Sequence, residues 1–445
     1  MNAGAGQTTL MRGTIITMCD DLPFLHDGMI VIEDGKIVHV GPADPERAVG
    51  EVIDCSELIV LPGFINTHTH THSPLLRGVA DDQTLMDWLT KSMWPAEKHI
   101  TATHARNGAL LSCLELIESG VTTYADQYYF SEEVAQAAVE SGQRALVAPT
   151  VFSRPTPESD DPIGVARRFI ERHLGDDSRI EPCIGPHAIY SCSTETLQAV
   201  RDIALEYDVL VHIHLSETQQ ENDDCMRQHG VSPTRYLEQI GLLDARVLAA
   251  HCVHISEDDR QILARHNVKV SHNPISNFKL VSGWFDYPAF RRHGLDVSVA
   301  LDGVQSNNSF NLLADLKTGI LVQKTLHNDP TLLDAYEALK LITIDAARCL
   351  FREHELGSLE VGKCADLTFL DLSRAAMHPL HRNSFRQVVS AVVYAANGAD
   401  VSDVMVQGEF IYRHRRHVRL DRSTVIANAA ESSRQILEHI DFFSR

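Results

Sequence analysis

Histidines in two H-x-H pairs are the residues of this chain that most directly indicate chemistry. His68 and His70 follow the apolar run PGFIN, and His212 and His214 belong to HIHLSE. Side chains at positions i and i+2 of a strand point the same way, so the imidazoles of one pair can reach a single metal ion. His212 lies deeper in its run, where a core histidine is expected. We therefore take His68, His70 and His214 as candidate metal ligands.

A carboxylate and other titratable groups end further apolar runs. Asp302 lies in ALDG, His251 ends VLAAH, and Glu217 follows the second H-x-H pair. A buried aspartate is costly unless it binds a metal or is otherwise paired, so we add Asp302 to the ligand set. Three imidazoles and one carboxylate suit one Zn²⁺ per chain with a position left for water, and Fe²⁺ is chemically admissible.

These groups together predict a hydrolytic reaction. A bound Zn²⁺ lowers the pKa of water to about 7 and makes hydroxide available at neutral pH. Glu217 is then placed to give a proton to a ring nitrogen, and Asp302 to take the proton of the water. His251 can orient the hydroxide or stabilise developing charge. We expect attack at an sp² carbon that carries an amine.

Residues that are absent narrow the class of metal enzyme. The run CIGPHA holds His187 and no lysine that could bridge two metal ions, which favours a single ion. The chain also lacks the P-C-x-x-C motif of the zinc deaminases that act on nucleobases in nucleic acid. His72 continues the alternation of the first pair beyond its strand, and we expect it in a loop or behind the ligands.

The candidate groups stand at the ends of apolar runs that alternate with helical stretches. Continuous apolar strands buried on both sides are typical of a parallel sheet covered by helices. The pattern predicts an α/β fold, a (β/α)₈ TIM barrel with active-site residues at the carboxyl ends of its strands. The expected strands are 59–66, 121–128, 144–152, 179–188, 209–217, 246–252, 268–274 and 296–303.

The two ends of the chain show short β-like runs. Asp34-Gly35 is a hairpin signal between apolar runs, and Gly408 marks a turn near the other end. We expect these flanks to pair into one small domain. The predicted bounds are 1–60 and 357–421 for its two parts, 61–356 for the barrel and 422–445 for a C-terminal helix.

Composition and charge exclude several kinds of partner. Lys and Arg number 39 against 60 Asp and Glu, and the net charge of −21 repels nucleic acid and anionic membrane surfaces. The first residues lack a signal-peptide core, and no apolar run is long enough to span a bilayer. Nine cysteines without C-x-x-C pairs favour reduced thiols in a cytoplasm. We expect a small neutral or cationic substrate, and homo-oligomerisation stays open.

Motifs along nearly the whole chain resemble the amidohydrolase superfamily, in particular its S-adenosylhomocysteine/5′-methylthioadenosine deaminase and chlorohydrolase branch. The motifs are PGFINTHTH, LLRG, WPAE, HLSET, AAHCVH, SHNPISN, DGVQSNNSFN and GSLEVGKCADL. The resemblance implies a TIM barrel with a β-sandwich built from the two flanks. It also implies metal binding by the four ligands named above and proton handling by Glu217, His251 and Asp302.

The resemblance extends to residues that would contact substrate. Glu97 matches a glutamate that binds ribose hydroxyls, His187 a histidine that contacts the substrate ring, and Ser306 falls in a substrate-side loop. Trp88 and Trp94 could wall the pocket, although their spacing near a helix favours packing. Arg154 is the one arginine close after the third strand, which weakens the expected grip on an amino-acid carboxylate.

The predicted function is metal-dependent hydrolytic deamination of a nitrogen heterocycle. An adenine nucleoside is favoured: 5′-methylthioadenosine, S-adenosylhomocysteine, 5′-deoxyadenosine or adenosine, giving the inosine-type product and ammonia. The alternatives are an s-triazine chloro- or aminohydrolase and a guanine- or pterin-type deaminase, which would share the metal site. A non-catalytic metal-binding barrel is disfavoured because Glu217 and His251 are both present.

Overall fold

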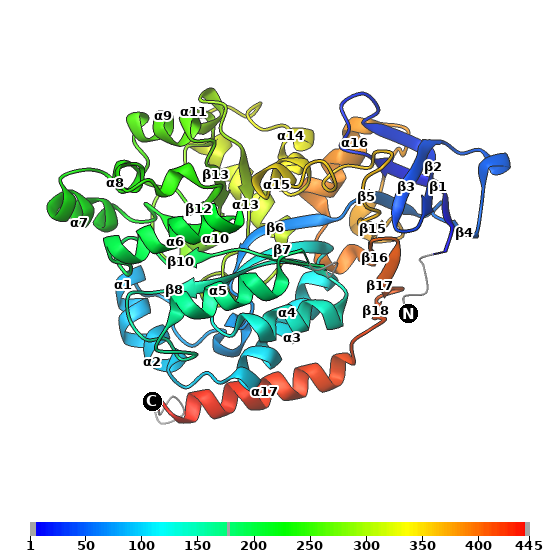
Figure 1. Cartoon of the computed structure of the whole chain (residues 1–445). Coiled ribbons are helices and arrows are strands. Elements are labelled where there is room, and N and C mark those ends of the chain that lie inside the picture. Colours follow the sequence, from blue (N-terminus) through cyan, green and yellow to red (C-terminus); the bar gives the residue numbers. More distant parts are fainter. Residues whose placement is uncertain (1–5, 176–178, 441–445) are drawn as a thin grey trace. The chain divides into compact units, whose positions relative to one another are not determined.

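The computed structural model describes residues 6–175 and 179–440, which form two compact units (Figure 1). Of the described residues, 6–66, 114–123 and 311–420 belong to the first unit, and 67–113, 124–175, 179–310 and 421–440 to the second. Within the described residues, no helix is both long and apolar enough to cross a membrane.

A nine-stranded sheet forms the first unit and joins the two ends of the chain. Strand β5 pairs antiparallel with β15, so that Val60 lies opposite Phe369. In Figure 1 the blue N-terminal strands and the orange C-terminal strands accordingly lie side by side. The strands are β1 Thr8–Ile16, β2 Phe24–Glu33, β3 Lys36–Pro42, β4 Glu51–Asp54, β5 Leu58–Pro62, β15 Leu367–Asp371, β16 Val401–Val406, β17 Glu409–Arg413 and β18 Arg416–His417.

Both turns expected in the flanks are confirmed. Asp34 and Gly35 join β2 to β3 with φ of 48° and 77°. Positive φ at both central residues is the geometry that matches the twist of a two-residue hairpin. Gln407 and Gly408, with φ of 51° and 75°, make the equivalent turn between β16 and β17.

Two further sheets provide the framework of the second unit, although their strands β6 and β7 begin in residues of the first unit. One sheet has the order β10-β8-β7-β6 with β9 beside β8, and the other the order β11-β12-β13-β14. The strands are β6 Phe64–Thr69, β7 Val121–Tyr128, β8 Arg144–Val151, β9 Ile180–Pro182, β10 Gly185–Pro186, β11 Val211–Leu215, β12 Val247–His251, β13 Lys269–His272 and β14 Val297–Val299.

Isolated bridges connect the edges of these two sheets. Thr69 pairs in parallel with Asp302, and Ile184 with Val211. Inside, the Thr67 hydroxyl lies 2.7 Å from the hydroxyls of both Ser271 and Ser298, which come from β13 and β14. The first strand of one sheet therefore contacts the last strands of the other.

The start of the first expected barrel strand, 59–66, is wrong. The expected strand is interrupted at Gly63, and the residues before Gly63 form β5 of the nine-stranded sheet. A Cβ at Gly63 would lie 2.1 Å from Thr122 Oγ1, so the close approach at this break requires glycine. The fourth expected strand, 179–188, is likewise split into two short strands, β9 and β10.

Helices follow the strands of the second unit, as expected for βα repeats. The stretches predicted at 101–119, 131–142 and 194–207 correspond to α3 Ala102–Glu118, α4 Ser131–Ser141 and α6 Thr194–Tyr207. Helix α17, Arg422–Glu438, lies within the predicted C-terminal helix, whose last residues are outside the described ranges. The remaining helices of the site are α1 Leu85–Asp87, the π-helix η3 Trp88–Met93, α2 Trp94–Glu97, α10 Pro274–Lys279 and α12 Val304–Asn307.

Candidate active site

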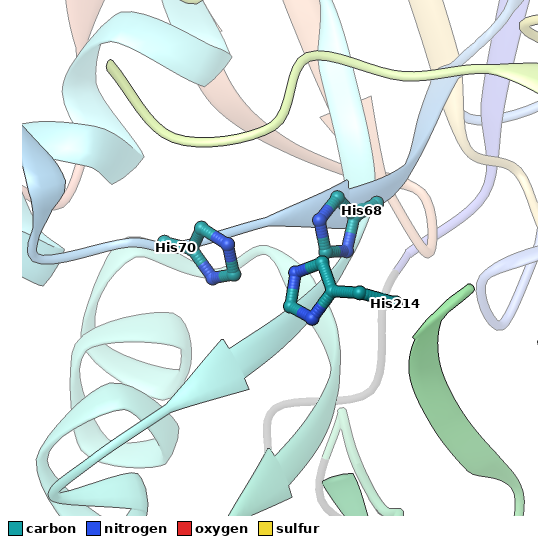
Figure 2. A group of neighbouring side chains, drawn as sticks. All are labelled: His68, His70 and His214. Atoms are coloured by element: carbon teal, nitrogen blue, oxygen red, sulfur yellow. The ribbon is translucent and has the colours of Figure 1, made fainter. Parts of the chain in front are cut away.

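Three histidines from two strands converge at the carboxyl ends of the second unit's strands. His68 and His70 come from the end of β6 and His214 from β11 (Figure 2). One ring nitrogen of each lies within 4.8 Å of the others, close enough to share one ion. The H-x-H spacing therefore does bring both imidazoles of the first pair to the same place.

Asp302, just after β14, supplies a carboxylate to this cluster. Its Oδ1 lies 3.4 Å from His68 Nε2 and 3.2 Å from His70 Nε2. Its Oδ2 accepts hydrogen bonds from Ser276 at 2.6 Å and Ser306 at 2.9 Å. One carboxylate oxygen is thus held by hydroxyl groups while the other faces the imidazoles.

The second nitrogen of each imidazole is anchored by a hydrogen bond. His70 Nδ1 donates to the Gln127 carbonyl, and His214 Nδ1 to the His187 carbonyl, both at 2.7 Å. A carbonyl oxygen can only accept, so Nδ1 carries the hydrogen and Nε2 keeps its lone pair. His68 Nδ1 lies 2.8 Å from His212 Nε2. Such contacts orient metal-ligating histidines.

The charge states of His68, His214 and Asp302 suit metal binding, whereas that of His70 does not: burial lowers the pKa of His70, but the neighbouring Asp302 carboxylate raises it above its usual value. Burial lowers the pKa of His68 to about 4 and lowers the pKa of His214 as well, so both imidazoles stay neutral at pH 7. Burial alone would raise the pKa of Asp302, but the His68 and His70 rings beside its carboxylate hold that pKa well below its usual value. Neutral imidazoles and an ionised carboxylate are the forms that bind a metal ion.

Glu217 and His251 lie together beside the cluster. Glu217 Oε2 is 3.8 Å from His251 Nε2, and Oε1 accepts a hydrogen bond from Ser282 at 2.9 Å. Burial raises the pKa of Glu217, which favours the protonated form needed by an acid. One ring nitrogen of His251 also falls within 4.8 Å of ligand atoms of His68 and Asp302.

Backbone conformation is unusual where these side chains leave the strands. Ser216, His251 and Asp302 have φ of 49°, 71° and 62°. Left-handed backbone is unfavourable for residues with a Cβ, and it concentrates at functional sites. The strand ends are therefore shaped to aim polar side chains inward at a cost in backbone energy.

A cavity of about 600 Å³ opens onto the cluster. Its lining includes His70, His214, Glu217, His251 and Asp302 together with several aromatic rings. Aromatic rings can hold a flat heterocycle against the polar groups, as is usual for small-molecule sites. The aromatic residues of the lining are Trp88, Trp94, Tyr128, Tyr129, Phe152 and Tyr190.

Glu97 and His187 line this cavity at different points. Glu97 is buried and accepts a hydrogen bond from the Tyr128 hydroxyl. Burial raises the pKa of Glu97, and the hydrogen bond from Tyr128 opposes that shift. His187 stacks on Phe152 with ring centroids 4.6 Å apart, and its Nδ1 lies 2.9 Å from Ser191 Oγ.

Arg154 lies in an adjoining cavity of about 550 Å³ that shares Trp94, Glu97 and Tyr129 with the first. Its guanidinium is 5.0 Å from the ring centroid of Trp94 and 4.6 Å from that of Phe152. The two rings hold the arginine by cation–π attraction at the edge of the main cavity.

Ser306, His72 and His212 lie near the cluster but do not line the cavity. Ser306 binds Asp302 and the Gly303 carbonyl and is not part of the cavity lining. His72 is buried against the Tyr128 ring, with centroids 3.6 Å apart, and within the described residues its ring nitrogens have no hydrogen-bond partner. His212 is buried, as a core histidine would be, but it contacts His68.

Several groups around the cluster escaped the sequence analysis. The motif SHNPISN was noted without a role, yet its Ser276 and Asn277 hydrogen-bond Asp302 and His251. Tyr128 and Ser282, partners of Glu97 and Glu217, belong to no motif that the sequence analysis named. Serine and asparagine are common in loops, so their presence in the sequence does not predict these contacts.

Comparisons with known proteins agree with this arrangement. The Amidohydrolase family matches residues 59–411. A protein of Thermodesulfovibrio yellowstonii named 5-methylthioadenosine/S-adenosylhomocysteine deaminase is 38% identical, over 95% of this chain and 98% of its own length. A 5′-deoxyadenosine deaminase of Methanobrevibacter smithii is also 38% identical, over 92% of this chain and 94% of its own length.

Solved structures give the same result. A zinc-bound adenosine deaminase from Xanthomonas campestris superposes with a TM-score of 0.92 at 32% identity, covering 97% of this chain and 99% of its own. The zinc complex of atrazine chlorohydrolase TrzN from Arthrobacter aurescens, 24% identical, shares the fold with a TM-score of 0.87 over 96% of this chain and all of its own. Sequence and fold thus agree over almost the full length: this chain is a hydrolase that belongs to the amidohydrolase family.

Proposed function

We propose that this protein is a metal-dependent hydrolytic deaminase of adenine nucleosides, which releases ammonia and leaves the inosine-type product. The observation that carries the proposal is the position of Glu217 and His251 at the same end of the cavity as the His68, His70, His214 and Asp302 cluster. The names of the relatives support the same reaction, because they are deaminases of 5′-substituted or 5′-deoxy adenosines.

The proposed metal is one Zn²⁺ per chain, with Fe²⁺ as the chemical alternative, held by His68, His70, His214 and Asp302. The residues fit such an ion: among the described residues, the buried His68 Nε2 makes no hydrogen bond of ordinary geometry. Each Nδ1 is already engaged, so the Nε2 atoms are left for the ion. Borderline-soft imidazole nitrogen with one carboxylate oxygen is the donor set that zinc accepts.

A bound Zn²⁺ would act as a Lewis acid and lower the pKa of water, so that a nucleophile is available near neutral pH. Asp302 Oδ1 would accept a proton of the attacking water and pass it to the amine, which then leaves as ammonia, while Ser276 and Ser306 hold Oδ2. Glu217 gives a proton to the ring nitrogen next to the attacked carbon. His251 Nε2, 3.8 Å from Glu217, would orient the water by accepting a hydrogen bond from it.

The substrate end of the cavity favours a nucleoside. A buried carboxylate needs hydrogen-bond donors, and two ribose hydroxyls would supply them to Glu97 in addition to Tyr128. His187, Phe152 and Trp88 would enclose the base. Arg154 could meet a carboxylate on the 5′ substituent, but a single arginine gives a weaker grip than a matched pair.

We further propose that the two parallel sheets close into a (β/α)₈ barrel of residues 61–356, and that 1–60 and 357–421 form a β-sandwich. The bridges Thr69–Asp302 and Ile184–Val211 support closure. The pairing of β5 with β15 supports one domain made from both flanks. The cytoplasmic location, the C-terminal helix to residue 445 and any homo-oligomer stay predictions.

Ammonia release across a substrate panel tests the proposed function. We expect 5′-methylthioadenosine, 5′-deoxyadenosine or adenosine to be deaminated at least as efficiently as S-adenosylhomocysteine. Guanine, pterins and s-triazines serve as the other arms. The proposal fails if every adenine nucleoside is inert while one of these rings without ribose turns over.

A further inference from the structure

One short segment, residues 276–282, contacts three candidate catalytic groups that come from three different strand ends. Helix α10 carries the first two of these contacts and the turn after it carries the third. The contacts are Ser276 Oγ to Asp302 Oδ2 at 2.6 Å, Asn277 Oδ1 to His251 Nδ1 at 2.8 Å, and Ser282 Oγ to Glu217 Oε1 at 2.9 Å. The segment therefore fixes which atom of each group remains free to face the cavity.

The contact of Asn277 with His251 has the clearest chemical consequence. An amide oxygen can only accept, so His251 Nδ1 must carry the hydrogen that joins them. In neutral His251 the lone pair is then on Nε2, the atom that lies 3.8 Å from Glu217 Oε2. The opposite tautomer would place an N–H where the reaction needs an acceptor.

The surroundings of Asn277 hold the residue in place beside His251. The side chain is fully buried, and its Nδ2 lies 3.5 Å from His272 Nδ1. The His272 ring stacks on Phe285, with centroids 4.3 Å apart at 16°. The main chain of Asn277 is fixed at both groups, because its N–H donates to the Asn273 carbonyl and its own carbonyl accepts from Ser282 N–H.

We infer that Asn277 is a positioning residue that keeps His251 in the Nδ1–H tautomer, with Nε2 as the acceptor for the reacting water. The inference rests on the proposed function for its catalytic consequence, although the tautomer itself does not. The two serine contacts act in parallel, because they occupy Oδ2 of Asp302 and Oε1 of Glu217 and leave the other carboxylate oxygens free.

Two substitutions at Asn277 test the catalytic consequence. Asn277→Leu removes the acceptor at similar volume, and Asn277→Asp keeps an oxygen in the same place. Loss of a residue that orients an active-site histidine typically costs about 10–100-fold, so we expect Asn277→Leu to lower kcat by that factor with metal content unchanged. Asn277→Asp should recover most of the loss, and KM should stay within about threefold for both.

A matched control comes from the same unit. Asn107→Leu also removes an amide hydrogen bond, from Asn107 Nδ2 to Ser432 at 3.0 Å, but it touches no candidate catalytic group. Its kcat should equal that of the unmodified protein. Wild-type kcat in Asn277→Leu, loss of its metal, or an Asn277→Asp variant as slow as Asn277→Leu would each overturn the inference.

The tautomer can be measured without any variant of Asn277. In zinc-loaded protein with ¹⁵N-labelled histidine, the His251 signals are those that disappear in His251→Gln. We expect its Nδ1 to be protonated and Nε2 to be unprotonated, and the reverse pattern would refute the inference. This readout separates the two claims: a protein that deaminates nothing refutes the proposed function but leaves the tautomer measurement intact.

Discussion

Residues 29–32 of strand β2 and all of strand β6 are buried, but their side chains differ in chemistry. Met29, Ile30 and Ile32 on β2 are 0% exposed, as are Asn66, Thr67 and His68 on β6. Burying an apolar side chain contributes about 1.5–3 kcal/mol to folding. A buried polar side chain that is hydrogen-bonded, as Thr67 is to Ser271 and Ser298, contributes only about 0.5–1.5 kcal/mol. Residues 29–32 of β2 therefore contribute mainly to stability, whereas β6 carries side chains of the candidate site.

The packing around the two strands repeats this difference. Ile30 and Ile32 belong to an apolar cluster with Leu10, Phe369 and other residues of the nine-stranded sheet. His68 is instead surrounded by the rings of His70, His212, His214 and His251, whose centroids lie 4.8–5.6 Å away. Substitutions in the histidine cluster should thus change chemistry, and those in the apolar cluster should change stability alone.

Loss of a ligand should have the largest effect. His214→Ala removes one of three imidazoles, so we expect metal content and ammonia release to fall together to background. His229→Ala is the matched control, because His229 stacks on Tyr236 and is not part of the cavity lining. Elemental analysis and the ammonia assay measure both quantities. Retained metal in an inactive His214→Ala protein would show that His214 is no ligand.

Replacement of the proposed acid should come next. Glu217→Gln keeps the shape and the contact with Ser282 but cannot donate a proton as an acid. General acid–base catalysis contributes about 10²–10⁴-fold, so kcat should fall by that order while the metal stays bound. Glu195→Gln, on the exposed first turn of α6, should leave kcat unchanged. Near-normal turnover in Glu217→Gln would assign the proton to another group.

A smaller effect is expected at the substrate end of the cavity. Glu97→Ala removes a charged hydrogen-bond acceptor, which is worth about 1–3 kcal/mol, or about 5–150-fold in KM for adenine nucleosides. Glu97→Gln keeps one acceptor oxygen, so its KM should lie between the KM of the unmodified protein and that of Glu97→Ala. Steady-state kinetics measures the KM of each variant for adenosine and for a ring that lacks ribose. An equal rise in KM for both substrates would argue against ribose recognition.

The smallest effect on turnover is expected in the apolar cluster. Ile30→Val removes one buried methyl group and should lower the free energy of unfolding by about 0.5–1.5 kcal/mol. Denaturant unfolding measures this change. The kcat per mole of folded, metal-loaded protein should stay at the wild-type value. A drop in kcat with unchanged stability would break the proposed separation between the two regions.

The sequence was informative where residue type alone restricts chemistry. Histidines at alternate positions and an aspartate after an apolar run have few uses, and His68, His70, His214 and Asp302 do meet in one cluster. Their roles as metal ligands are still a proposal. The hairpin at Asp34-Gly35 was equally predictable, because few residues accept two positive φ angles.

Other features depended on tertiary contacts that periodicity cannot report. The run 59–66 reads as one apolar strand, yet Gly63 divides it between two sheets, and Pro62-Gly63 was the local signal of a turn. Ser306 was assigned to the substrate, but its hydroxyl binds Asp302. The contact between Asn277 and His251 joins residues 26 positions apart, and nothing in an asparagine predicts such a partner.

Zinc titration of metal-free protein tests the central claim most directly. Chelator-treated protein should release no ammonia from 5′-deoxyadenosine, and activity should rise linearly with added Zn²⁺ up to one ion per chain. A single ion is expected because His187, and no lysine, stands at the end of β10, so no bridging group for a second ion is present there. Full activity in the chelated protein, or a requirement for two tightly held ions per chain, would contradict the account.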